Sequence, residues 1–295
     1  MSGREFHIVD VFAERKYAGN QLAVITEADG LDGDMMQAIA REMNFSETTF
    51  VLGPGAGTAA FRVRIFTPAE EVPFAGHPTL GTAWVIRREL LSEPCDRVTL
   101  ELGVGSIPVS FERSADSSEL LWMLQRQPEF GPVASMSELA VVLGIEESAL
   151  IGDHPIQQVS TGLPFWIVPL TSLEEVRSCR LDVAAYEAFI RDRQARAILV
   201  FAAEAYDEAN QINARMFAPY YGVSEDPATG SANGCLAAYL VRHGVLGGNE
   251  IDIRVEQGYE IGRPSLLRLR AWEREGRFEI QVGGRVIPIA RGRLL

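Results

Sequence analysis

Arg215-Met-Phe-Ala-Pro219, followed by Glu225-Asp-Pro-Ala-Thr-Gly-Ser231, repeats the pattern of Arg64-Ile-Phe-Thr-Pro68 followed by Val72-Pro-Phe-Ala-Gly-His77. In both copies Arg-x-Phe-x-Pro is typical of the end of a strand, and the Pro-x-x-Gly that follows is typical of a tight turn. Each turn runs into an apolar stretch, which predicts a helix after each turn. The fold is therefore expected to contain one unit built twice.

The two predicted helices cover Thr79–Leu90 and Ala232–Val241, and a weaker echo lies upstream, where Gly19-Asn-Gln-Leu-Ala-Val24 resembles Gly162-Leu-Pro-Phe-Trp-Ile167. The helix starts match in pairs: Gly76 with Gly230, and His77 with Ser231. A helix start exposes unpaired N–H groups and the positive end of the dipole, so two starts aimed at one cleft predict an anion site. The alternative is that both glycine turns only connect a strand to a helix, and the paired match argues against it.

Strand-like and helix-like segments are interleaved without regular βαβ repeats, which favours an α+β fold of two similar lobes related by a pseudo-twofold axis. The pattern breaks near Pro128–Pro132, and Ser135-Met-Ser-Glu138 offers a capping box to a new helix. The predicted lobes are therefore residues 1–127 and 128–295, with the last strand a candidate to pack on the first lobe. A Gly/Pro-rich turn at 53–57 and a polar hairpin loop at Arg113–Glu119 are expected in the first lobe.

Length and composition are those of a soluble globular enzyme, with 295 residues, 47% hydrophobic and 23% charged. No apolar run reaches membrane-spanning length, and the N-terminal residues lack the layout of a signal peptide. The net charge of −13 argues against a surface for nucleic acid or anionic membrane. Three widely spaced cysteines, Cys95, Cys179 and Cys235, indicate a reducing cytosol rather than a disulfide framework.

The sequence offers little to hold a cofactor or a metal. Lys16 is the only lysine, and its context fits neither a pyridoxal Schiff base nor a Walker loop. No G-x-G-x-x-G follows an early strand, as dinucleotide binding would require. The four histidines lie far apart without zinc-ligand spacing: His7, His77, His154 and His243. We therefore expect no cofactor and no metal, with the chemistry carried by carboxylates, histidine, hydroxyls and backbone amides.

Several side chains are candidates for chemistry, each with a plainer alternative. Glu47 has aromatic neighbours in the sequence, and apolar surroundings would raise the pKa of its carboxyl toward the range useful for proton transfer. Most glutamates, however, are simply solvated. His77 is a candidate proton carrier or orienting donor, although a lone histidine is more often structural. Asp226 precedes a proline and could only start a turn, and Ser231 could only cap its helix.

One set of motifs extends along the whole chain: Asp10-Val-Phe, Gly19-Asn20, Met43-Asn-Phe-Ser-Glu-Thr-Thr-Phe-Val51, Phe66-Thr-Pro, Pro73-Phe-Ala-Gly-His-Pro-Thr-Leu-Gly81, Phe217-Ala-Pro and Glu225-Asp-Pro-Ala-Thr-Gly-Ser-Ala232. Together they resemble the PhzF family, the phenazine-biosynthesis isomerases within the diaminopimelate-epimerase-like fold. The resemblance implies two similar α+β lobes, each a curved sheet wrapped around a central helix, with the active site between them. It also implies a homodimer and no cofactor.

Matched by motif, the resemblance implies Glu47 as the catalytic acid/base, with His77 and Asp226 as side chains that orient the substrate. Gly76 and Ser231 stand where the related epimerases place their two catalytic cysteines. Two-base racemisation needs an acid and a base on opposite faces of one carbon, and both thiols are missing here. A single carboxylate can instead move a proton between two carbons on the same face of an unsaturated ring or chain.

The expected function is that of a cofactor-independent isomerase of a small unsaturated carboxylic acid bearing amino or hydroxyl groups, similar to dihydro-3-hydroxyanthranilate isomerase. The substrate would bind at Asn20, Gly76, Gly230 and Ser231. Two alternatives stay open: a racemase or epimerase, against which the missing cysteine pair speaks, and a non-catalytic protein that binds small carboxylates. Retention of Glu47, His77 and Asp226 together argues against the second. We expect a cytoplasmic homodimer that binds neither nucleic acid nor membrane.

Overall fold

The computed structural model describes residues 3–55, 60–93, 95–113 and 118–295. The chain forms two compact units, Met1–Leu124 with Gly283–Leu295, and Gln125–Val282. Residues 56–57 of the expected turn and 114–117 of the expected hairpin loop lie outside the described residues. Within the described ranges, no helix is long and apolar enough to cross a membrane.

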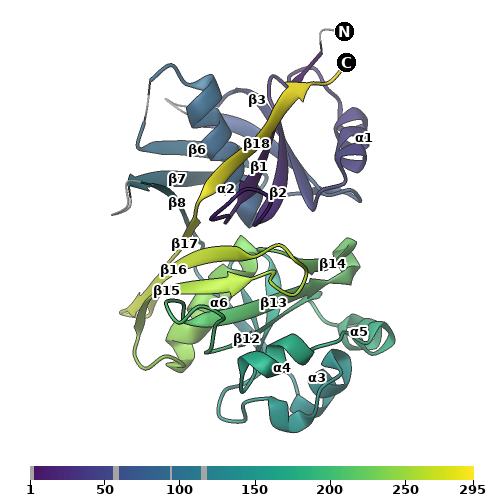
Figure 1. Cartoon of the computed structure of the whole chain (residues 1–295), viewed down its shortest axis with the longest axis vertical. Helices are drawn as coiled ribbons and strands as arrows, with labels where there is room; N and C mark the ends of the chain where they lie inside the picture. The colour runs from purple at the N-terminus through teal and green to yellow at the C-terminus, as the bar shows by residue number, and fades with distance from the viewer. Residues whose placement is uncertain (1–2, 56–59, 94, 114–117) are drawn as a thin grey trace. The chain divides into compact units, whose positions relative to one another are not determined.

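The first unit is a ladder of strands around one buried helix (Figure 1). Its elements are β1 Glu5–Val11, β2 Asn20–Ile25, α1 Gly33–Met43, β3 Glu47–Pro54, β4 Ala60–Phe66, β5 Glu71–Val72, α2 Gly76–Val85, β6 Arg97–Leu102, β7 Gly105–Arg113, β8 Glu119–Leu124 and β18 Val286–Arg293. The last strand returns to the first unit and pairs antiparallel with β1 along the whole length of β1.

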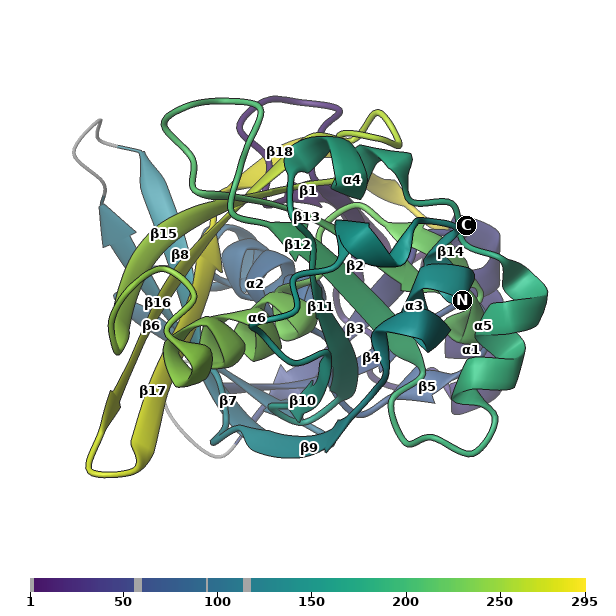
Figure 2. The ribbon, with the colours of Figure 1, turned by 90° about the horizontal axis from the view of Figure 1, so that it is seen from below.

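The second unit adds three helices outside its strands. Its elements are β9 Glu129–Val133, α3 Met136–Leu143, β10 Gln157–Ser160, β11 Pro164–Pro169, α4 Leu173–Ser178, α5 Val183–Ile190, β12 Ala197–Ala202, β13 Ile212–Ala218, β14 Val223–Asp226, α6 Gly230–His243, β15 Glu250–Gln257, β16 Ser265–Arg274 and β17 Arg277–Gly284, which ends inside the first unit. Seen from below in Figure 2, α3, α4 and α5 lie in front of the strands.

Each unit encloses one helix that is apolar on nearly all sides. Most residues of α2 are buried, as are all residues of α6 from Gly230 to Val241. A helix of this kind is stable only when it is surrounded, and α2 contacts seven strands of its unit while α6 contacts β10, β11, β15 and β16. Close approach requires Gly81 in α2, because a Cβ there would meet Leu22 Cδ2 at 2.6 Å and Val11 Cγ2 at 2.8 Å. The side chains of β2 that alternate in step with Leu22 therefore face α2.

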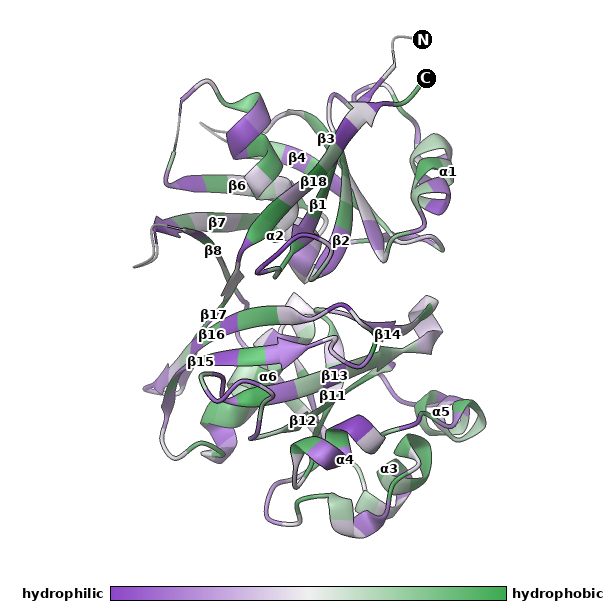
Figure 3. Cartoon of the chain, viewed as in Figure 1, coloured by the Kyte–Doolittle hydropathy of each residue, from purple (hydrophilic) through white to green (hydrophobic). Residues whose placement is uncertain are grey.

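Strand alternation separates an inner face, against the central helix, from an outer face. In the second unit Trp166, Val168 and Val200 join the outer cluster built with α3 and α5, two helices rich in hydrophobic residues (Figure 3). Phe201, of the opposite parity, contacts Tyr239 of α6 with ring centroids 5.8 Å apart. Because both faces are covered, every residue of β11 and β12 is buried.

The order of strand pairing is the same in the two units. In the first, β2 runs parallel to β3, β3 antiparallel to β4, and β4 pairs with both β5 and the parallel β6. In the second, β11 runs parallel to β12, β12 antiparallel to β13, and β13 pairs with both β14 and the parallel β15. The repeat expected from the sequence is therefore present in the topology.

The repeated Arg-x-Phe motif makes the same local contacts twice. Arg64 donates to Glu71 at 2.7 and 2.6 Å, and Arg215 donates to Glu225 at 2.9 and 2.8 Å. Each guanidinium also lies over the phenylalanine two residues further along, at 5.1 and 4.9 Å from the ring centroid. The motif thus ties the strand to the short strand beside it, ahead of each helix.

Several element boundaries differ from the sequence prediction. Both matched helices begin earlier than predicted, at Gly76 and Gly230, because the first N–H groups of a helix need no intrahelical partner and so tolerate glycine and proline there. The segment near Pro128–Pro132, interpreted as a break, contains strand β9, and α4 was not predicted. The capping box of Ser135 and Glu138 is confirmed.

Candidate active site

Three polar side chains of the first unit meet at the N-terminus of α2. Asn20 begins β2 and Glu47 begins β3. Asn20 alternates in step with Leu22, and Glu47 alternates in step with Thr49. Leu22 lies against Gly81 of α2, and the Thr49 hydroxyl lies 2.7 Å from that of Thr82 of α2, so Asn20 and Glu47 are on the strand faces toward α2. His77 lies in the first turn of α2 and is 3% exposed. Its Nε2 lies 3.4 Å from Oε2 of Glu47, and its Nδ1 lies 3.1 Å from Nδ2 of Asn20. The structure therefore brings together three of the residues predicted from sequence.

The protonation state of His77 follows from this geometry. Burial lowers the pKa of its imidazole to about 3, so the ring is neutral near pH 7. The positive end of the α2 dipole acts in the same direction. The Asn20 amide donates to Nδ1, which assigns the ring proton to Nε2, the nitrogen that faces Glu47. The contact is thus a neutral donor beside a carboxylate rather than an ion pair.

The Nε2–H group of His77 is not fully used. Although it lies within ion-pair distance of Glu47, it makes no aligned hydrogen bond within the described residues. Glu47 itself is partly buried, with 18% of its side chain exposed. A buried donor without an aligned acceptor is costly unless another group completes it, so this corner is arranged to accept a further polar molecule.

The second unit places Asp226, Gly230 and Ser231 at the N-terminus of α6. Asp226 ends β14, is 5% exposed, and its carboxylate accepts a hydrogen bond from the Thr229 hydroxyl. Ser231 lies inside the first turn of the helix and is not its N-cap, which is Thr229. The alternative reading of Ser231 as a simple helix cap is therefore wrong.

Neither central helix has its N-terminus closed by a capping side chain. The N-cap residues are Ala75 for α2 and Thr229 for α6, and neither side chain makes a capping hydrogen bond. In contrast, the caps of α1, α3, α4 and α5 all accept one. Both glycine turns thus leave the start of the helix available to an anion.

A buried network of hydrogen bonds, which was not predicted from the sequence, holds the turn between Asp226 and the start of α6. Gln257, at the end of β15, donates to the carbonyl of Asp226 at 2.8 Å and to Oγ1 of Thr229 at 3.1 Å. Its own oxygen accepts from N of Thr229 at 3.2 Å and from Nδ2 of Asn233 at 2.9 Å. Thr229, directly before the glycine, could have been recognised as a helix cap, but nothing in the sequence links Gln257 to this turn.

Two of the cysteines, Cys179 and Cys235, are buried and are poor nucleophiles. Burial raises the pKa of the Cys235 thiol to about 12, and Cys235 lies in α6 with its sulfur 3.7 Å from the hydroxyl of Thr161. Burial likewise raises the pKa of Cys179 to about 12. Across the described ranges, no group of three or more His, Cys, Asp and Glu side chains could hold a metal ion.

Comparison with known proteins gives one consistent family. A sequence profile described as "Phenazine biosynthesis-like protein" matches residues 9–292. The trans-2,3-dihydro-3-hydroxyanthranilate isomerases of Pseudomonas fluorescens and Pseudomonas chlororaphis are 39% and 40% identical to this chain, over 98% of both proteins in each case. A Bacillus anthracis phenazine biosynthesis protein of the PhzF family superposes with a TM-score of 0.91 at 29% identity, covering 100% of both chains.

The fold extends to more distant enzymes. A probable proline racemase from Agrobacterium radiobacter K84 superposes with a TM-score of 0.65 at 12% identity, over 99% of this chain and 93% of the racemase. At that identity the likeness concerns the fold alone. It agrees with the expected α+β, epimerase-like architecture.

Proposed function

This chain belongs to the phenazine biosynthesis-like, or PhzF, family and is an isomerase, and we propose that it moves a proton within a small unsaturated carboxylic acid, without a cofactor. The two Pseudomonas relatives are named as isomerases of trans-2,3-dihydro-3-hydroxyanthranilate. A substrate of that kind, bearing amino and hydroxyl groups, is the one we assign to this enzyme.

The observation that carries the proposal is the contact between Glu47 and the neutral ring of His77. Glu47 abstracts a proton from one carbon and returns it to another carbon of the same conjugated system. His77 donates from Nε2 to the substrate or to Glu47, and Asn20 holds the tautomer that makes this donation available. General acid–base catalysis needs only that the carboxylate alternate between its two protonation states.

Asp226 and the two helix starts bind the substrate in this proposal. The substrate carboxylate is assigned to backbone N–H groups at a helix start of this kind, at Gly76 or at Gly230–Ser231, because neither helix has a capping side chain. Asp226, oriented by Thr229, accepts from an amino or hydroxyl group. Such contacts orient the substrate and stabilise the charge that develops.

The test is turnover of trans-2,3-dihydro-3-hydroxyanthranilate, followed by the change in absorbance of its conjugated system and by NMR in D2O. Wild type is expected to convert it, and Glu47→Gln to be slower by about 10²–10⁴-fold, because an amide cannot accept and return a proton. The exposed Glu42→Gln on α1 serves as the matched control and should retain full activity. Wild-type turnover by Glu47→Gln would remove Glu47 from the mechanism, and no turnover by the wild type would remove this substrate.

Racemisation is tested in the same preparation. Because Gly76 and Ser231 occupy the two helix starts without thiols, and Cys235 is buried and protonated, we expect no exchange of the α-proton of free amino acids in D2O. Exchange at the α-carbon would support the epimerase alternative instead.

We also propose that the enzyme is a homodimer of the reducing cytosol. Cys95, Cys179 and Cys235 are all free thiols, as expected where disulfides are not formed. Light scattering of the purified protein should give twice the mass of the 32.4 kDa chain, and localisation of a tagged chain should follow a cytosolic marker. A monomer mass would contradict the dimer.

A further inference from the structure

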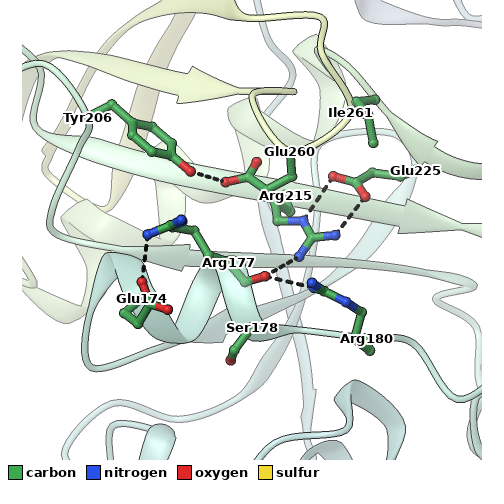
Figure 4. Close-up of a pocket in the computed structure, with 9 residues that line it drawn as sticks. All are labelled: Glu174, Arg177, Ser178, Arg180, Tyr206, Arg215, Glu225, Glu260 and Ile261. Carbon is green, nitrogen blue, oxygen red and sulfur yellow. Dashed lines mark hydrogen bonds and ion pairs between the residues drawn. The ribbon is translucent and has the colours of Figure 1, made fainter.

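The second unit contains a pocket between helix α4 and the strands β13 and β14 (Figure 4). Its volume is about 590 Å³, within the range of roughly 300–1,000 Å³ that is typical of small-molecule sites. Charged side chains dominate its lining: three arginines and three glutamates, Arg177, Arg180, Arg215, Glu174, Glu225 and Glu260. Equal numbers of both signs make the pocket neutral overall.

Two of these arginines are already paired with two of the glutamates. Arg215 is 7% exposed and donates twice to Glu225 and also to the carbonyls of Val176 and Cys179, so its guanidinium is occupied. Arg177 pairs with Glu174 at 2.7 Å on the exposed helix surface. In each pair the two charges neutralise each other, so neither pair is expected to bind a charged ligand.

The remaining two charged side chains of the pocket, Arg180 and Glu260, form no salt bridge within the described ranges. Arg180 donates from one nitrogen to the carbonyls of Arg177 and Cys179, both at 2.8 Å, and pairs with no carboxylate of the described residues. Glu260 accepts from the Tyr206 hydroxyl through Oε1 at 2.8 Å, while its Oε2 is buried without a hydrogen bond. Burial, followed by the contact with Glu260, raises the pKa of Tyr206 to about 12, so this hydroxyl stays a neutral donor and does not compensate the charge.

This pocket is separate from the candidate active site. Glu225 and Asp226 are adjacent on β14, so their side chains point to opposite faces of the strand. Glu225 lies with Arg215 on the outer face, near α4, whereas Asp226 contacts Thr229 at the start of α6. None of Asp226, Gly230 and Ser231 lines the pocket.

The first unit has a counterpart pocket beside its own Arg–Glu pair. That pocket has a volume of about 550 Å³ and is lined by Arg64 and Glu71, by the charged residues Arg62 and Glu101, and by several apolar residues. Its other arginine, Arg62, lies 3.5 Å from Asp29 and is therefore paired. Both arginines of the counterpart pocket are therefore in salt bridges, whereas Arg180 of the second-unit pocket forms none within the described ranges.

We propose that the second-unit pocket binds a small zwitterion, a free amino acid or a compound of the same charge pattern, with its carboxylate on Arg180 and its ammonium group on Glu260. Such a ligand supplies a negative group to Arg180 and a positive group to Glu260, the two charged side chains that form no salt bridge. The buried Oε2 of Glu260 gains a donor, and the free nitrogens of Arg180 gain an acceptor with fork geometry. Ile261 and Ser178 form part of the remaining wall.

The test is calorimetric titration of the full chain with α-, β- and γ-amino acids, using acetate and ethylammonium as probes that carry only one of the charges. At least one amino acid is expected to saturate the wild type at millimolar concentration, with both single-charge probes weaker by about tenfold or more, since each lost charged hydrogen bond costs about a factor of ten in affinity. Arg180→Gln and Glu260→Gln should each weaken binding by a similar factor.

The control variant is Arg62→Gln, which removes an exposed arginine from the counterpart pocket and should bind as the wild type does. Glu47→Gln should also bind normally, because its site is in the other unit. Circular dichroism checks that each variant is folded, and Arg180→Lys, which keeps the charge, should restore part of the affinity. The proposal is overturned if no amino acid saturates the wild type, if Arg180→Gln and Glu260→Gln bind normally, or if Glu47→Gln abolishes binding.

Discussion

His77 is expected to make the stability of this enzyme depend on pH in a defined window. Burial lowers the pKa of the folded imidazole to about 3, whereas an unfolded histidine has a pKa of about 6.5. Between these values the unfolded chain binds a proton that the folded chain does not. Stability from this group is therefore complete above pH 6.5 and is lost progressively as the pH falls toward 3.

The size of the effect follows from the same two pKa values. Each unit of difference corresponds to about 1.4 kcal/mol, so at pH 5 the folded state loses about 2 kcal/mol relative to pH 8 from His77 alone. A neutral His77→Gln variant lacks this proton, so its free energy of unfolding should fall by about 2 kcal/mol less than that of the wild type over the same range. Urea unfolding at pH 5 and pH 8, for both proteins, measures the difference.

NMR of the imidazole carbon-bound protons checks the cause directly. His77 is expected to show no titration between pH 5 and 8. A His77 pKa near 6.5, or equal pH dependence of wild type and His77→Gln, would refute the assignment of a buried neutral ring. The mechanistic consequence would also fail, because a ring that titrates near neutrality could carry a proton itself instead of donating a fixed one beside Glu47.

Two further predictions, each with a control substitution, concern the repeated Arg–Glu pair and the hydrogen-bond network of the turn after Asp226. Glu225→Gln leaves the nearly buried guanidinium of Arg215 without its counter-charge and should lower the free energy of unfolding by about 3–5 kcal/mol. Glu71→Gln breaks the matching pair at a half-exposed site and should lower the free energy of unfolding by about 1 kcal/mol or less. Equal losses for the two variants in denaturant unfolding would contradict the dependence on burial. Gln257→Leu removes the four hydrogen bonds that hold the turn after Asp226. It should lower kcat by about tenfold or more, because misplaced orienting groups slow the reaction steeply. The control Gln281→Leu on β17 should leave kcat unchanged in the same assay.

The parts of the fold that the sequence predicts are those written in local patterns. The repeated Arg-x-Phe-x-Pro and Pro-x-x-Gly segments predicted two strand–turn–helix units, and the structure contains them with the same Arg–Glu and Arg–Phe contacts in each. Family membership, the epimerase-like fold and the isomerase class are confirmed by the comparisons. The short strand β9 and helix α4 were missed because a Pro-rich stretch and a six-residue helix carry little periodicity.

The site was predictable only in part, for a similar reason. Motif resemblance predicted Glu47 and His77, but the bond from Asn20 to the imidazole joins residues 57 positions apart in the sequence. The pKa of His77 depends on its complete burial by strands that no local pattern specifies. Gln257 lies on a different strand from Asp226 and is revealed only by the hydrogen bonds of the folded chain.

The two copies of the unit also bear on the proposal that one carboxylate carries the reaction. In the first copy, strand register places Leu22 of β2 opposite Glu47 of β3; in the second, Phe165 of β11 lies opposite Ala197 of β12. Leu22 and Phe165 occupy the same place in the repeated segments that begin at Gly19 and Gly162. The counterpart of Glu47 is therefore an alanine, which cannot exchange a proton. A mechanism with one base, returning the proton that it removed, is the mechanism that this asymmetry favours over two-base racemisation.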